Sequence, residues 1–112
     1  MALQHAQPLQ PIDLAVALDP NASGLSHSLL KTEQLQLIKL VLPRGQVMPQ
    51  HQVPGEITIQ CLLGEVEITT PQRGCLLRVG ELVLLPGGEP HALQALQDAK
   101  LLLTLLFVLP PR

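Results

Sequence analysis

The stretch from Arg44 to Ile68, RGQVMPQHQVPGEITIQCLLGEVEI, decides what kind of structure this chain can form. A histidine, a carboxylate and bracketing glycines interrupt an apolar run, which is the pattern of a metal-binding β-hairpin. In the segment ITIQCLL every second residue from Ile57 onward is apolar. Because side chains alternate across a strand, these residues share one face, and we expect that face to be the interior one.

The rest of the chain is also typical of β structure. Eleven prolines and eight glycines fall every few residues, which excludes long helices and favours short strands joined by tight turns. We expect strands at residues 30–42, 56–63, 66–70, 75–79, 81–85, 91–95 and 101–109. So many short strands must close into a sandwich or barrel, since an open sheet would leave its edges unprotected. The predicted fold is all-β, with an extended N-terminal arm at residues 1–28 and one barrel domain at residues 29–112.

A second segment, GELVLLPGGEPHALQA from Gly80 to Ala95, echoes the first, because each runs from a glycine to a histidine. It resembles the second motif of the cupin superfamily, G-x5-P-x-G-x2-H-x3-N. Gly80, Pro86, Gly88 and His91 fall at the family spacing, while Ala95 stands in place of the final Asn. The glycines of both segments are expected in turns, with backbone angles that other residues rarely adopt.

The opening stretch in turn resembles the first cupin motif, G-x5-H-x-H-x3,4-E-x6-G. Gly45, His51 and Gly64 fall in register, but Val53 replaces the second histidine and Ile57 replaces the glutamate. The chain is thus similar to small single-domain cupins of the type-2 conserved-barrel kind, with a degenerate first metal motif. This resemblance implies a cupin-type double-stranded β-helix, which is a jelly-roll barrel.

The two motif histidines and the apolar strand face predict a ligand pocket inside the barrel. We expect it to be lined by His51, Val53, Ile57, Ile59, Cys61, His91 and Leu93. Alternatively, each histidine is a neutral core residue that hydrogen-bonds to the backbone or to water. The Cys61 thiol is expected to be a small inert core group rather than a nucleophile.

A complete cupin site with three histidines and one glutamate would hold Fe, Mn, Ni or Zn and leave positions open for oxygen or substrate. Here His51 and His91 are the remaining candidate metal ligands. Glu56 could become a third ligand only through a β-bulge, because its parity in the strand turns it away from them. Val53 and Ile57 make the cavity drier, and dehydrating a divalent ion there costs more than two nitrogen ligands return. A bound divalent metal is therefore the less favoured prediction.

Three functions remain open at this point. The first is a barrel that binds a small organic ligand, such as an acid or a phenol, without a full metal site. The second is a metal-dependent cupin enzyme, of dioxygenase or isomerase type, that works with a reduced set of histidine ligands. The third is metal-free acid–base catalysis by a histidine, which lacks the partner carboxylate or tyrosine that such chemistry uses.

The composition also predicts partners. Only 14% of residues are charged, against about 25% in ordinary domains. Much apolar surface therefore needs covering, and we expect a homodimer that uses the arm or outward residues such as Leu102 and Leu106. Phe107 is the one residue among Phe, Tyr and Trp, and the net charge is −2, so nucleic acid is not an expected partner.

No membrane partner is expected either. The longest apolar run, residues 101–109, is about half of the roughly 20 residues that a membrane helix needs. The first twenty residues lack the positive start and the unbroken apolar core of a secretory signal. The two cysteines show no paired spacing, and we expect a cytoplasmic protein in which both are reduced.

Overall fold

The structure is a computed structural model that describes residues 5–14 and 26–108. Its described elements are nine strands, so the all-β prediction is confirmed. The strands are β1 (His27–Lys31), β2 (Leu35–Leu42), β3 (Val47–His51), β4 (Ile57–Leu63), β5 (Glu65–Thr69), β6 (Gly74–Arg78), β7 (Leu82–Leu85), β8 (His91–Ala95) and β9 (Ala99–Leu106).

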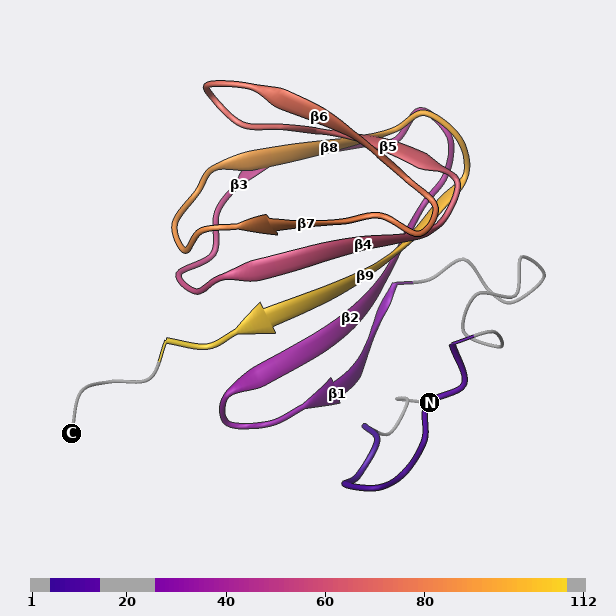
Figure 1. Ribbon diagram of the computed structural model, residues 1–112, viewed down its shortest axis with the longest axis vertical. Helices are drawn as coiled ribbons and strands as arrows, with labels where there is room; N and C mark the ends of the chain where they lie inside the picture. Colours follow the sequence, from indigo (N-terminus) through magenta and orange to yellow (C-terminus); the bar gives the residue numbers. More distant parts are fainter. Residues whose placement is uncertain (1–4, 15–25, 109–112) are drawn as a thin grey trace.

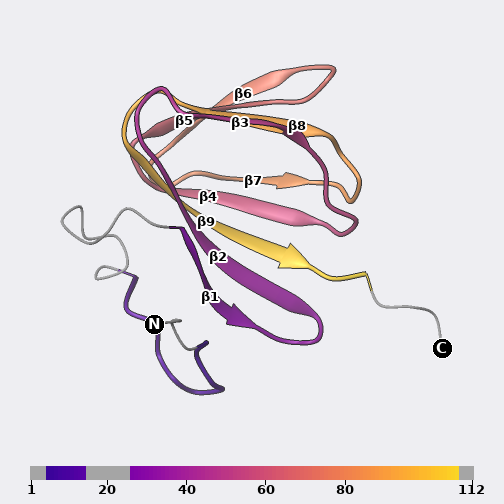
Figure 2. The ribbon, with the colours of Figure 1, turned by 180° about the vertical axis from the view of Figure 1, so that it is seen from behind.

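The strands form two antiparallel sheets. The larger sheet has the order β1-β2-β9-β4-β7, and the smaller sheet has the order β3-β8-β5-β6. Figures 1 and 2 show the smaller sheet lying over β4 and β7, while β1 and β2 extend away from it. The edge strands are β1 and β7 in the larger sheet and β3 and β6 in the smaller one. Among the described residues no ladder joins β6 to β7, so the barrel is open between these two edges.

The core fills the space between the two sheets and follows the predicted alternation. Ile57, Ile59 and Cys61 of β4 are buried, while Thr58 and Gln60 between them are only partly buried. The same alternation holds on the neighbouring strands. The buried hydrophobic core consists of Leu42, Ile57, Ile59, Cys61, Val66, Ile68, Leu77, Leu85, Leu93, Ala95, Ala99, Leu101 and Leu103.

The single strand expected at residues 30–42 is in fact two strands, and that prediction was wrong. A tight turn separates β1 from β2, and it is built around the Thr32 hydroxyl. Thr32 Oγ1 accepts hydrogen bonds from the backbone N–H groups of Gln34 and Leu35, both at 3.1 Å. A threonine side chain can replace a ladder bond in this way, and the turn carries no glycine or proline to signal it.

Strand β3 was not expected, because Pro49 in its middle cannot donate a ladder hydrogen bond. The sheet order explains how the proline is tolerated. β3 is an edge strand with β8 as its one neighbour in the sheet, so one side of its backbone has no strand to pair with.

The four motif glycines have the predicted unusual backbone. Gly45, Gly64, Gly80 and Gly88 have φ angles of +85°, +78°, +88° and +78°. Gly64 is constrained twice, because an added Cβ atom would also collide with the backbone carbonyl oxygen of Asp98. The turn between β4 and β5 therefore requires glycine for its conformation and for the close approach of another loop.

The described part of the predicted arm, residues 5–14, lies beside β1. The backbone N–H of Ala6 donates to the carbonyl oxygen of Leu29 at 3.0 Å. The expected boundary at residue 28 falls inside β1, and the remaining arm residues 1–4 and 15–25 lie outside the described residues. Across the described ranges, no helix has the length and apolarity to cross a membrane.

Candidate ligand-binding site

The two motif histidines meet on neighbouring strands of the smaller sheet. His51 ends β3, His91 begins β8, and the two residues are partners in the β3–β8 ladder. Their ring centroids lie 4.3 Å apart, with the ring planes tilted by 56°. His91 is only 1% exposed, and His51 is half-buried. The structure thus brings together the two residues that both motifs single out.

An irregularity in β3 turns the His51 side chain toward His91. The ladder pairs Met48 with Leu93 and His51 with His91, so two residues of β3 face the single residue Ala92 of β8. Without this bulge, alternation would turn Met48 and His51 to opposite faces. With the bulge, Met48 lies opposite Leu93 and His51 lies opposite His91, and both of these partners are buried.

Each imidazole is oriented by a backbone carbonyl two residues before it. His51 Nδ1 lies 3.1 Å from the oxygen of Pro49, and His91 Nδ1 lies 2.9 Å from the oxygen of Glu89. A carbonyl oxygen can only accept, so Nδ1 must be the protonated nitrogen in both rings. In the neutral state each Nε2 therefore keeps a lone pair for a ligand. The same carbonyl contact is how metal-binding histidines are usually held.

The other expected pocket residues are placed around the core. Ile57, Ile59, Cys61 and Leu93 are buried, and Val53 is half-buried and packs against them. None of these five offers a charge or a strong hydrogen-bonding group. Leu93 shares a strand face with His91, two residues along β8.

Cys61 has the environment of a structural thiol. Its Sγ donates to the carbonyl oxygens of Leu63 at 3.5 Å and Gly64 at 3.4 Å. Burial raises the pKa of the Cys61 thiol, and the nearby Glu81 and Glu65 carboxylates act in the same direction. The thiol therefore stays protonated at neutral pH, which fits the expected inert role.

The described residues do not fit the metal centre of a complete cupin. Glu56 is exposed, and its backbone carbonyl accepts from Leu106 N–H at 3.0 Å. Among residues 5–14 and 26–108, no three His, Cys, Asp or Glu side chains are grouped so that they could hold a metal ion. Two ring nitrogens fall short of the three protein ligands that catalytic zinc sites use.

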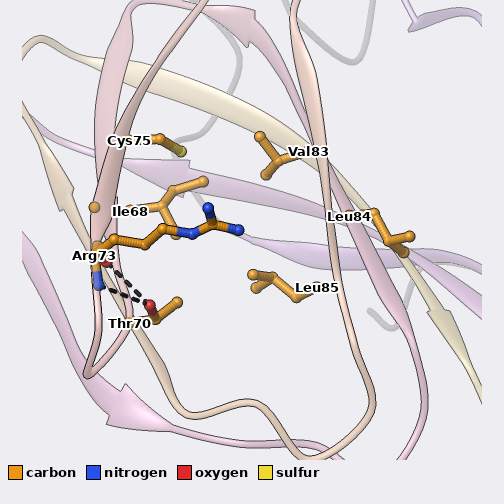
Figure 3. A pocket seen from close by; sticks show the side chains of 8 residues that line it. Ile68, Thr70, Arg73, Cys75, Val83, Leu84 and Leu85 are labelled. Atoms are coloured by element: carbon orange, nitrogen blue, oxygen red, sulfur yellow. Dashed lines mark hydrogen bonds between the residues drawn. The ribbon is translucent and has the colours of Figure 1, made fainter.

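A pocket of about 280 Å³ lies between the β5–β6 turn and β7, at the opening of the barrel. Figure 3 shows the Arg73 side chain reaching across it from the turn toward β7. Its lining residues are Ile68, Thr70, Arg73, Gly74, Cys75, Val83, Leu84 and Leu85. None of them was expected to line a ligand site. The alternation that buries Ile68 continues to Thr70 and would have indicated one wall, but the opposite wall on β7 depends on the tertiary fold.

In this chain two antiparallel sheets lie face to face and the two motif histidines are in contact. Solved structures of other proteins share the fold. A conserved protein of unknown function from Streptococcus pyogenes superimposes with a TM-score of 0.79 at 25% identity, and the match covers 98% of this chain and 97% of that one. A cupin superfamily protein from Desulfitobacterium hafniense gives a TM-score of 0.78 at 20% identity, over 96% of this chain and all of that one.

A solved structure with a lower TM-score has the same fold over most of this chain. A DMSP lyase from Ruegeria pomeroyi matches 75% of this chain with a TM-score of 0.67 and 25% identity, and the match spans 46% of the lyase. No protein-family model and no curated protein matches the sequence. The chain has the double-stranded β-helix fold of cupin barrels, as its motifs predict.

Proposed function

We propose that this cupin-domain protein binds a small organic ligand through His51 and His91, without a full metal site. The observation that carries the proposal is the paired arrangement of the rings, 4.3 Å apart, with both Nδ1 atoms held by backbone carbonyls. Small-molecule sites are mostly apolar, with a few polar groups that converge on the ligand. The two Nε2 atoms, together with the buried Leu93 that shares a strand face with His91, fit that combination.

The chemistry of the pair narrows the kind of ligand. A buried ring nitrogen that loses water on binding needs a hydrogen-bond partner, because an unsatisfied polar group costs about 1–3 kcal/mol. In their neutral state both Nε2 atoms accept hydrogen bonds. A ligand with a hydroxyl proton is therefore favoured over a purely apolar one of the same size.

The test is a titration with phenol and with small organic acids, followed through the imidazole C2–H signals in proton NMR. We expect saturable shifts that disappear in His51→Ala and in His91→Ala. His5→Ala, which changes a histidine of the arm, is the matched control and should leave binding unchanged. Undiminished binding by both site variants would overturn the proposal.

The second candidate is a metal-dependent cupin enzyme, and one observation favours it. Both histidines have the carbonyl-held Nδ1 that metal ligands usually show. Metal analysis of protein purified without a chelating tag separates the two candidates. Stoichiometric Fe, Mn, Ni or Zn that is lost in His51→Ala and in His91→Ala would support this enzyme and contradict the metal-free site.

A further inference from the structure

We infer that the pocket beside Arg73 binds small monocarboxylates with an apolar body. The inference goes beyond the proposed function, because neither His51 nor His91 lines this pocket. Arg73 would bind the carboxylate group, and Ile68, Val83 and Leu85 would contact the hydrocarbon part.

The charge of the pocket points to an anion. Arg73 is the one charged side chain among the described residues that line it, and no carboxylate is among them. Within the described part of the chain, the ion pair shown by the structure is Arg78 with Glu65, not Arg73 with any acid. The Arg73 guanidinium is therefore available for an external anion. Its planar fork matches a carboxylate with two parallel hydrogen bonds.

The Arg73 backbone is held in place before any ligand arrives. The N–H of Thr70 donates to the Arg73 carbonyl at 2.7 Å. The Thr70 hydroxyl donates to the same carbonyl at 3.0 Å and accepts from the Arg73 N–H at 3.3 Å. Three bonds thus fix the turn from which the side chain reaches across the pocket (Figure 3). Such ordering lowers the entropic cost of binding.

The other walls of the pocket are apolar. Ile68 on β5 is 2% exposed and Leu85 on β7 is 8% exposed, so both are part of the core as well as of the pocket. Val83 beside them is half-buried. A ligand with a charged group at one end and a hydrocarbon body would satisfy both the guanidinium and these walls.

The strand register relates the turn that carries Arg73 to the histidine pair. The β5–β8 ladder pairs Ile68 with Leu93 and Thr69 with Ala92, which is the residue after His91. His91 is in turn paired with His51. The turn that follows Thr69 therefore begins at the same end of the smaller sheet as the two imidazoles.

The size of the pocket limits the ligand. At about 280 Å³ it lies just below the range of roughly 300–1,000 Å³ that is typical of drug-sized ligands. It suits an acid with a short chain or a single ring.

The test uses benzoate and benzamide, which share a shape and differ in charge. Cys75 lines the pocket and is exposed, whereas Cys61 is buried, so the rate at which iodoacetamide alkylates Cys75 reports occupancy. We expect benzoate to protect Cys75 in the wild-type chain at concentrations about tenfold lower than benzamide. Arg73→Gln should remove that difference. A higher salt concentration should weaken the protection of Cys75 by benzoate and leave the protection by benzamide unchanged.

Arg78→Gln is the matched control, since Arg78 lies on the same strand pair but outside the pocket. This variant should leave the protection of Cys75 by benzoate and by benzamide unchanged. Arg73→Lys, which keeps the charge, should retain part of the benzoate preference, and circular dichroism checks that each variant is folded. A benzoate preference that survives in Arg73→Gln would overturn the inference, as would no protection by either probe in the wild-type chain. In both cases the histidine titration above still decides the proposed function by itself.

Discussion

At the scale of single residues, the two histidines of the proposed site can be found from the sequence, whereas Arg73 of the inferred pocket cannot. His51 and His91 are recognisable because each sits at a fixed spacing from motif glycines along the chain. The alternation that buries Ile57 is equally local. Arg73 is different, because in the sequence it reads as an ordinary turn residue of PQRG. Only the packing of that turn against β7 makes it a pocket residue.

Gly64 supports a prediction about stability at this scale. Gly64→Ala and Gly80→Ala both force alanine into a positive φ, at +78° and +88°, which costs about 1–3 kcal/mol. At Gly64 the new Cβ also meets the carbonyl of Asp98, whereas at Gly80 nothing lies within 4 Å. Urea denaturation should therefore show a clearly larger loss of unfolding free energy for Gly64→Ala. Equal losses would show that the loop containing Asp98 moves away freely.

At the scale of elements, local patterns predicted most of the strands and missed those that depend on partners. β4 to β9 lie close to their expected positions, because alternation and turn residues mark them. β3 contains Pro49 and is recognisable only from its edge position beside β8. The division between β1 and β2 rests on hydrogen bonds of the Thr32 hydroxyl, which no composition rule indicates.

The paired strands β2 and β9 each carry one buried lysine, and this predicts a pH dependence. Lys39 and Lys100 are 4% and 5% exposed. The pKa of Lys39 is lowered by burial and, secondarily, by the positive charge of Lys100. Between this lowered pKa and the ordinary value of 10.5, the unfolded chain binds more protons than the folded one. Stability should therefore rise with pH in that window.

Lys39→Met should abolish this rise and increase stability at neutral pH, because no charge then has to be buried. The measurement is the urea midpoint at several pH values from 7 to 10. Lys31→Met, at an exposed position of β1, controls for the loss of one positive charge and should keep the rise. If the urea midpoint of Lys39→Met rises with pH as much as that of the wild type, the pH dependence does not come from Lys39.

At the scale of the whole molecule, the exposed apolar surface leads us to propose the expected homodimer. Leu82 and Leu84 are each 59% exposed on β7, with side chains on the outer face of the larger sheet. Leu102 lies on the same face, since it and Leu82 are both ladder partners of Gln60. These leucines flank Thr58 and Gln60 of β4 on the same face, and we propose that a second copy covers this surface.

Light scattering at micromolar concentration should give about twice the chain mass of 12.1 kDa. Leu82→Lys combined with Leu84→Lys should yield monomers, because two charges would have to be desolvated in the interface. Val47→Lys replaces a residue that is 54% exposed on the other sheet, and it should leave the dimer intact. A monomeric wild-type protein would contradict the proposal.

The additional residue in β3 affects how the site can change during evolution. Deletion of Gln50 would leave Met48 opposite Leu93 and the histidine opposite His91, now in a regular ladder, so the pair would survive. Insertion of one more residue would turn the imidazole toward solvent unless the strand bulged again. Shortening this edge strand by one residue therefore keeps the histidines paired, whereas lengthening it by one separates them without replacing either histidine.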